Sequence, residues 1–173
     1  MPERLPTRRL FFALWPNSRV RAEIVRRRSL IEGLSPRCVP DHNLHLTLLF
    51  LGNQPAERVG DLLTFADEVS GPGFQMVLDQ FGWFAAAKVV WLGGPAPPAA
   101  GALVERFAEV VKRTGLRYDA RPFHPHVTLY RRVARRPAFP DPAPLVWSVE
   151  EVALIESIPS RPYQVLRTWP LTV

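Results

Sequence analysis

The chain has 173 residues, 47% of them apolar, which allows a single domain with a hydrophobic core of useful size. It contains no run of about 18 apolar residues, and segment 10–15 is too short for a secretory signal, so we expect a cytoplasmic protein without a membrane span. The net charge of +6 favours a polyanionic partner, and the lone Cys38 excludes an internal disulfide.

The first half of the chain alternates predicted strands and helices. Residues 8–15 form an apolar strand, and Asn17 or Ser18 caps the following helix, which runs to about residue 31. Three consecutive arginines at 26–28 on this helix would face either solvent or a phosphate. The pattern then predicts a strand at 44–51, a helix at 56–69, and strands at 74–84 and 88–92 joined as a hairpin through residues 85–87.

The second half repeats this mixture after the proline-rich connector 95–98. It predicts a helix at 99–113, a strand at 127–130, a proline-rich loop at 135–144, and strands at 149–158 and 163–173. We therefore predict an α+β fold, a bilobal duplicated unit of antiparallel sheets with flanking helices around a central cleft. Residues 1–173 would form one domain with two pseudo-symmetric lobes, bridged by residues 95–98.

One short motif occurs in both halves. The sequence His-x-Thr-Leu begins at His45 in the first half and at His126 in the second, each time within an apolar strand. Because side chains on a strand alternate between its faces, His45 and Thr47 point the same way, roughly 6.6 Å apart. The same holds for His126 and Thr128, while the apolar residues between them point into the core.

These histidines allow several interpretations. A single histidine on a strand is usually an edge residue, and a single match to the motif would arise by chance in many sequences. Paired imidazoles at His42 and His45, and at His124 and His126, offer ligands to zinc, but no cysteine pair or H-E-x-x-H helix accompanies them. A metal would not need the repeated threonine, so we expect neither a metal nor another cofactor.

Acid–base chemistry would use both polar residues of the repeat, the histidine and the threonine. Two imidazoles that face each other across a cleft can act as one acid and one base near neutral pH. Two hydroxyl groups beside them can donate hydrogen bonds to anionic oxygens as charge builds up in a transition state. Reaction of a phosphate ester uses an acid–base pair and donors to the anionic oxygens. We therefore predict His45 and His126 as catalytic residues and Thr47 and Thr128 as phosphate-binding residues.

The residues around both motifs also resemble a known family. The first segment, 43–52, reads Asn-Leu-His-Leu-Thr-Leu-Leu-Phe-Leu-Gly, and the second, 121–129, reads Arg-Pro-Phe-His-Pro-His-Val-Thr-Leu. Both are similar to the motifs of the two-histidine (2H) phosphoesterases, and most of all to the RNA 2′,3′-cyclic phosphodiesterases, also called 2′-5′ RNA ligases. The resemblance runs over nearly the whole chain and is most specific at the two motifs.

This resemblance implies metal-independent hydrolysis of a terminal 2′,3′-cyclic phosphate to a 2′-phosphomonoester. It implies that His45 gives a proton to the leaving 3′ oxygen, that His126 activates water, and that Arg131 is a further phosphate contact. Strand alternation puts Arg131 on the face opposite His126, so it needs a strand end or a bulge to reach the cleft. Tyr130 replaces a small residue of the family and would narrow the cleft or stack on a base.

The expected partner is RNA with a 2′,3′-cyclic phosphate end, tRNA fragments among the candidates, bound by a monomer. Two alternatives use the same site for 2′-5′ RNA ligation or for hydrolysis of a small cyclic nucleotide. Ring strain in the cyclic phosphate makes hydrolysis the downhill direction. A third alternative is a non-catalytic module that binds RNA ends, although binding alone would not require the paired histidines.

Overall fold

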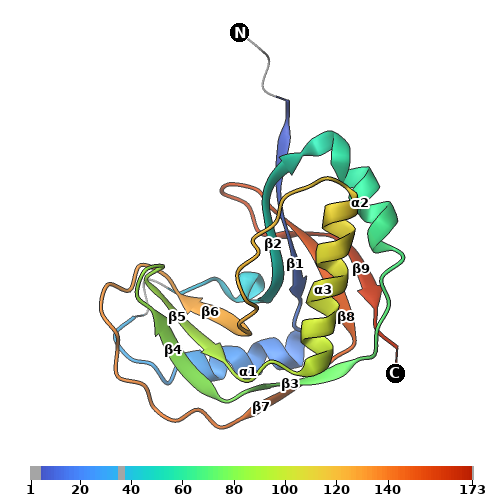
Figure 1. Cartoon of the computed structure of the whole chain (residues 1–173). Helices are drawn as coiled ribbons and strands as arrows, with labels where there is room; N and C mark the ends of the chain where they lie inside the picture. Colours follow the sequence, from blue (N-terminus) through green and yellow to red (C-terminus); the bar gives the residue numbers. More distant parts are fainter. Residues whose placement is uncertain (1–4, 35–37, 173) are drawn as a thin grey trace.

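The computed structural model describes residues 5–34 and 38–172, and in that part of the chain antiparallel strands pack with three α-helices (Figure 1). The fold is α+β, as the sequence predicts. The elements are β1 (Thr7–Leu14), α1 (Ser18–Arg28), η2 (Asp41–Asn43), β2 (Leu46–Pro55), η3 (Ala56–Arg58), α2 (Val59–Ala66), β3 (Phe74–Leu78), β4 (Gln80–Phe84), β5 (Val89–Gly93), α3 (Pro98–Arg113), β6 (His126–Tyr130), β7 (Leu145–Val149), β8 (Glu151–Ser157) and β9 (Gln164–Pro170).

The main sheet has seven strands in the order β4-β5-β6-β2-β1-β8-β9, and β3 pairs with β7 in a separate two-stranded sheet. Strands β1 and β2 pair along their whole length, whereas β2 and β6 share only the pair Leu46 and Val127. The main sheet is therefore two segments joined at one point. We name β2-β1-β8-β9 the four-stranded segment and β4-β5-β6 the three-stranded segment.

Burial patterns explain why the elements form where they do. Residues from Leu10 to Leu14 in β1 are all buried, since this strand is covered on both faces. Helix α3 packs Leu103, Phe107 and Val111 against the sheet, and the ring of Phe107 stacks on that of Phe12 at 4.2 Å. In Figure 1, α2 and α3 lie beside the four-stranded segment.

Helix α1 begins as predicted and ends earlier than predicted. The side chain of Asn17 accepts a hydrogen bond from the backbone N–H of Val20 at 2.9 Å, which confirms Asn17 as the cap. The helix ends at Arg28, and single turns carry the chain on to Ile31. The second predicted helix is also shorter, because residues 56–58 form a 3-10 turn and α2 covers only Val59–Ala66.

Two predicted strands are each divided. The strand expected at 74–84 breaks at Asp79, so β3 pairs with β7 and β4 pairs with β5 in different sheets. The backbone N–H of Asp79 donates to the carbonyl of Gly93 at the break. The strand expected at 149–158 breaks at Glu150, whose carbonyl accepts from Leu171, and this break separates β7 from β8.

The two halves of the chain are interleaved in the sheet. Strands β4 and β5 come from the first half but pair beside β6, and β8 and β9 come from the second half but pair beside β1. The proline-rich connector at 95–98 leads from β5 in the three-stranded segment to α3, which packs on β2 and α2. Within the described residues, none of the helices is both long and apolar enough to cross a membrane.

Candidate active site

The point where the two sheet segments join is also where the two motifs meet. Leu46 of β2 pairs with Val127 of β6 in antiparallel register, and both side chains are fully buried. Continuing that register by one residue in each direction sets Thr47 opposite His126, and His45 opposite Thr128. Because side chains alternate along a strand, all four polar groups lie on the face away from Leu46 and Val127.

Both imidazoles are held in the same way by the backbone. Nδ1 of His45 donates to the carbonyl of Asn43 at 2.7 Å, and Nδ1 of His126 donates to the carbonyl of His124 at 2.7 Å. A backbone carbonyl only accepts, so Nδ1 carries the proton and Nε2 is the free basic nitrogen of each neutral ring. The two rings are thereby prepared for proton transfer through Nε2.

A cavity of about 570 Å³ opens on this face, a size typical of small-ligand sites. His126, Thr47, Thr128 and Arg131 line it together. His45 does not line the cavity itself; its Nε2 atom lies 3.1 Å from the hydroxyl of Thr47, which does. In the neutral ring Nε2 has no proton, so the Thr47 hydroxyl donates to it.

Aromatic rings surround His45. Its ring centroid is 4.8 Å from that of Phe11, 5.3 Å from Tyr163 and 6.0 Å from Trp15. This burial lowers the pKa of His45 to about 4, and the nearby charge of Arg131 adds to the effect. At neutral pH His45 is therefore uncharged in the free protein.

His126 has a different aromatic neighbourhood. The ring of Phe84 meets it edge-on at 5.1 Å, and the ring of His124, two residues earlier, lies 6.0 Å away. Burial lowers the pKa of His126 below its ordinary value, and the positive charge of Arg131 acts in the same direction, while the hydrogen bond to the carbonyl of His124 opposes them. Arg121 and Arg131 line the cavity and favour an anionic ligand, and a bound anion would in turn favour the protonated form of a nearby imidazole.

Arg131 reaches the cavity because β6 contains a bulge. Thr128 pairs with Trp91 of β5, but the neighbouring Val90 pairs with Tyr130, so β6 carries one extra residue between these pairs. The extra residue inverts the alternation of side chains beyond it, and the exposed side chain of Arg131 lines the cavity. Both features that could bring Arg131 to the cavity are present: the bulge between Thr128 and Tyr130, and the end of β6 at Tyr130.

The prediction for Tyr130 is wrong. Its side chain is 4% exposed and belongs to the hydrophobic core, where its hydroxyl donates to the carbonyl of Arg28 at 3.0 Å. Strict alternation would put Tyr130 on the same face as His126, four positions earlier, but the bulge turns it to the opposite face. Tyr130 anchors β6 to α1 and neither narrows the cavity nor meets a base in it.

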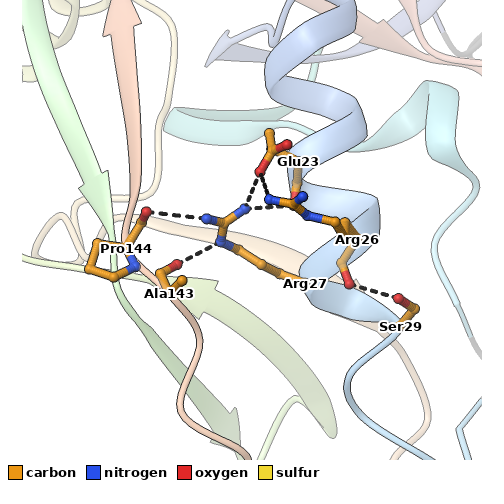
Figure 2. Close-up of polar contacts among 6 residues, drawn as sticks. All are labelled: Glu23, Arg26, Arg27, Ser29, Ala143 and Pro144. Atoms are coloured by element: carbon orange, nitrogen blue, oxygen red, sulfur yellow. Dashed lines mark hydrogen bonds and ion pairs between the residues drawn. The ribbon is translucent and has the colours of Figure 1, made fainter.

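The three arginines at 26–28 do not face a phosphate. Arg27 is buried and donates to the carbonyls of Ala143 and Pro144 and to Glu23, as Figure 2 shows. Arg26 pairs with Glu23 as well, and Arg28 pairs with Asp41. The run is neither a phosphate site nor, at its central residue, a solvated face.

Sequence reasoning missed the aromatic wall beside His126. The ring centroids of Phe84, Trp91 and His124 lie 5.1–5.4 Å from one another. Phe84 and His124 line the cavity. The isolated Gly82 was a usable signal in the sequence, because a glycine within a strand often marks a close approach of another group. In the structure that group is Trp91, whose Cζ2 atom would lie 2.0 Å from a Cβ at position 82.

The zinc interpretation gains no support from the arrangement of side chains. Across residues 5–34 and 38–172, no group of three or more histidine, cysteine, aspartate or glutamate side chains is placed to hold a metal ion. The Nδ1 atoms of His45 and His126 are both engaged by backbone carbonyls.

Paired His-x-Thr motifs on adjacent antiparallel strands of an α+β fold define a two-histidine phosphoesterase. A sequence profile of one such family, described as the 2′-5′ RNA ligase superfamily, matches residues 16–159. The chain belongs to the 2′-5′ RNA ligase superfamily.

Relatives and solved structures agree with this assignment. The RNA 2′,3′-cyclic phosphodiesterase of Escherichia coli is 36% identical over 171 residues, which cover 95% of this chain and 97% of the relative. The RNA 2′,3′-cyclic phosphodiesterase of Thermus thermophilus is 33% identical, with 86% and 81% covered. The crystal structure of Escherichia coli LigT complexed with 3′-AMP aligns with a TM-score of 0.87 and 34% identity, covering 97% of this chain and 100% of LigT.

Proposed function

We propose that this protein hydrolyses a terminal RNA 2′,3′-cyclic phosphate to a 2′-phosphomonoester. The observation that carries the proposal is the pairing of Leu46 with Val127, which puts both His-x-Thr motifs on one face beside one cavity. The names of the relatives from Escherichia coli and Thermus thermophilus support the same reaction.

In the proposed mechanism, the two histidines act on opposite sides of one phosphorus atom. Nε2 of His126 takes a proton from water as the water oxygen attacks phosphorus. The bond between phosphorus and the 3′ oxygen breaks, and His45 gives a proton to that oxygen. Thr47, Thr128 and Arg131 hold the non-bridging oxygens while negative charge builds on them.

The resting state of His45 adds one requirement to this mechanism. Its Nε2 accepts a hydrogen bond from Thr47 and its pKa is lowered to about 4, so the ring must gain a proton before it can act as the acid. A cyclic phosphate diester carries one negative charge, and its approach favours the charged form of a nearby imidazole, which His45 needs as the acid while His126 stays neutral as the base. Substrate binding would thus help to protonate His45.

Turnover of a short RNA with a 2′,3′-cyclic phosphate end, measured in EDTA, tests the proposal. We expect the wild-type protein to form a 2′-phosphomonoester, and His45→Ala and His126→Ala each to lower kcat by about 10²- to 10⁴-fold. His42→Ala is the matched control, because His42 is exposed on η2 three residues before His45 and does not line the cavity. It should retain the wild-type rate.

Each part of the proposal has its own contrary result. An unchanged rate in either histidine variant would remove the acid–base assignment. No turnover by the wild-type protein would remove the substrate, and turnover that stops in EDTA and returns with added zinc would restore the metal interpretation. Binding without any product would leave a module that only recognises RNA ends.

The same residues can run a sister reaction, 2′-5′ ligation, in which the 5′-hydroxyl of a second RNA replaces water: His126 takes its proton, the bond between phosphorus and the 3′ oxygen breaks, and His45 gives a proton to that oxygen. The family description favours keeping this alternative. Both reactions open the strained five-membered ring, but water is present in large excess over RNA 5′ ends, so we expect ligation to be minor. Analysis of the linkage in products formed from two RNA ends would measure it, and a small cyclic nucleotide offered alone would measure the other alternative.

The proposal also covers the substrates, the oligomeric state and the cellular compartment. We propose RNA ends, tRNA fragments among them, as the substrates, and a monomer acting in the cytoplasm. Both motifs of the cavity come from one chain, which is why a monomer would suffice. Residues 1–173 would act as one domain, with the pseudo-symmetry of the two lobes centred on Leu46 and Val127.

A further inference from the structure

The loop between β6 and β7, residues 131–144, is unusually rich in arginine. It carries four arginines and one aspartate, and we call it the arginine loop. Arg131, Arg132, Arg135 and Arg136 are all exposed. In Figure 1 the loop runs along the outer edge of the molecule, beside β4 and β5.

These arginines differ from most others in lacking carboxylate partners. Among the described residues, no ion pair engages any of the four, and Arg136 lies over the ring of Phe139 at 5.5 Å. Ion pairs with carboxylates engage Arg8, Arg26, Arg27, Arg28, Arg58, Arg113, Arg121 and Arg167. Positive charge without local compensation is therefore concentrated on one loop.

The loop starts at the rim of the active-site cavity. Val133 is buried; its backbone N–H donates to the carbonyl of Lys88 at 2.9 Å, and its carbonyl accepts from Nε1 of Trp83 at 2.9 Å. Lys88 closes the turn between β4 and β5, and Ala86 and Ala87 of that turn line the cavity. The arginines after Arg131 thus continue outward from the cavity mouth.

The other end of the loop is fixed too. Buried Arg27 donates to the carbonyls of Ala143 and Pro144, as seen in Figure 2. Prolines at 137, 140, 142 and 144 further restrict the backbone. A loop held at both ends loses little conformational entropy when it binds a ligand, so its arginines are preorganised for binding.

We propose that Arg132, Arg135 and Arg136 form a track for the backbone phosphates of single-stranded RNA upstream of the cyclic end. The inference rests on the proposed function for the position of that end, which places the terminal phosphate against Thr47 and Thr128. The nucleotides before it must leave the cavity, and the rim at Arg131 leads them onto the unpaired guanidinium groups. Arginine is well suited to this role because its planar fork matches a phosphate.

The test compares RNA with a mononucleotide in one triple variant. Arg132→Asn, Arg135→Gln and Arg136→Gln removes three charges, and asparagine tolerates the left-handed backbone at 132. Binding of a short fluorescent RNA that ends in a 2′-phosphate is read by anisotropy, without any turnover. We expect affinity to fall about tenfold or more at low salt, and the slope of log affinity against log salt to flatten by about 2.

Activity on two substrates distinguishes the track from the chemistry. We expect kcat/KM on RNA with a cyclic end to fall with the affinity, while kcat/KM on 2′,3′-cyclic AMP stays within about twofold of the wild-type value. The matched control removes three exposed cations of α3, through Arg106→Gln, Lys112→Gln and Arg113→Gln, none of which lines the cavity. It should leave RNA affinity nearly unchanged.

Several outcomes would overturn the track. These are an unchanged RNA affinity in the loop variant, an equal loss in the α3 control, or an equal fall in activity on RNA and on 2′,3′-cyclic AMP. Failure of the proposed function is a separate result: the wild-type protein would then turn over neither cyclic substrate, while the anisotropy measurement would still decide whether the loop binds RNA.

Discussion

At the scale of single residues, the two histidines share a backbone setting and differ in their surroundings. Both donate from Nδ1 to the carbonyl two residues earlier. His45 is enclosed by Phe11, Trp15 and Tyr163, whereas His126 opens directly onto the cavity. Equivalent strand positions therefore give two imidazoles in different environments, which is what separate roles as acid and base require.

The lowered pKa of His45 makes the folded protein sensitive to acid. In an unfolded chain a histidine has a pKa of about 6.5, and in the fold His45 has a pKa of about 4. Between these values the unfolded chain binds the proton first, so the free energy of unfolding falls as pH drops through this window. We expect His45 to account for on the order of 2–3 kcal/mol of that fall, and for none of the pH dependence above the window.

Urea unfolding at about pH 7 and about pH 4 measures this effect. His45→Gln cannot titrate, so its free energy of unfolding should fall less between the two pH values than that of the wild type. His42→Gln, at an exposed position nearby, should follow the wild type. An acid loss in His45→Gln as large as in the wild type would show that other groups cause the sensitivity.

The sequence predicts those residues of the candidate site that belong to the repeated motif. The two histidines and two threonines follow from one repeated pattern and strand alternation, and Arg131 followed from the resemblance to a family. His124 and its aromatic neighbours could not be found in this way, because their contacts depend on how β4, β5 and β6 pair. Tyr130 was misjudged for a related reason: alternation puts it on the cavity face, and only the pairing of β6 with β5 reveals the bulge that turns it into the core.

At the scale of elements, the sequence predicts what each segment is better than where it ends. Apolar periodicity located α3, β1 and β5 almost to the residue. It missed the breaks at Asp79 and Glu150, because a chain that passes from one sheet to another keeps its alternation of apolar and polar residues. Hydrogen bonds from neighbouring strands, which a single sequence does not reveal, decide those breaks.

The contact between α1 and the start of β7 depends on one buried charge. Arg27 is 5% exposed, and its guanidinium donates to two carbonyls of the arginine loop and to Glu23 (Figure 2). Arg27→Met retains most of the apolar stem of the side chain but leaves both carbonyls and Glu23 without this donor. We expect the free energy of unfolding to fall by about 2–4 kcal/mol.

The control for this prediction lies one residue earlier. Arg26 is exposed and makes one ion pair with the same Glu23, so Arg26→Met should cost about 0.5 kcal/mol or less in urea unfolding. A similar small loss for Arg27→Met would show that water can replace its bonds to Ala143 and Pro144. Because Arg27 also fixes the end of the arginine loop, its variant should bind RNA more weakly than the Arg26 variant.

At the scale of the whole molecule, the interleaved chain explains how a narrow joint can hold two sheet segments together. Only Leu46 and Val127 pair across the joint, yet each segment contains strands from both halves of the chain. One continuous core also runs beneath both, with Phe12 on one side of the joint and Leu92 and Leu129 on the other. The connection is made by packing and chain crossings more than by sheet hydrogen bonds.

This shared core predicts that the two segments unfold together. Separating them would expose apolar surface on both sides, so neither segment should persist alone at a denaturant concentration that unfolds the other. Incorporation of fluorotryptophan and ¹⁹F NMR can follow each part during urea unfolding: Trp83 and Trp91 report on the three-stranded segment, and Trp169 on the four-stranded segment. We expect all three native signals to disappear with one midpoint. Loss of the Trp83 and Trp91 signals at a clearly lower urea concentration than that of Trp169 would mean that the two segments are separate folding units, joined at the site and not by a common core.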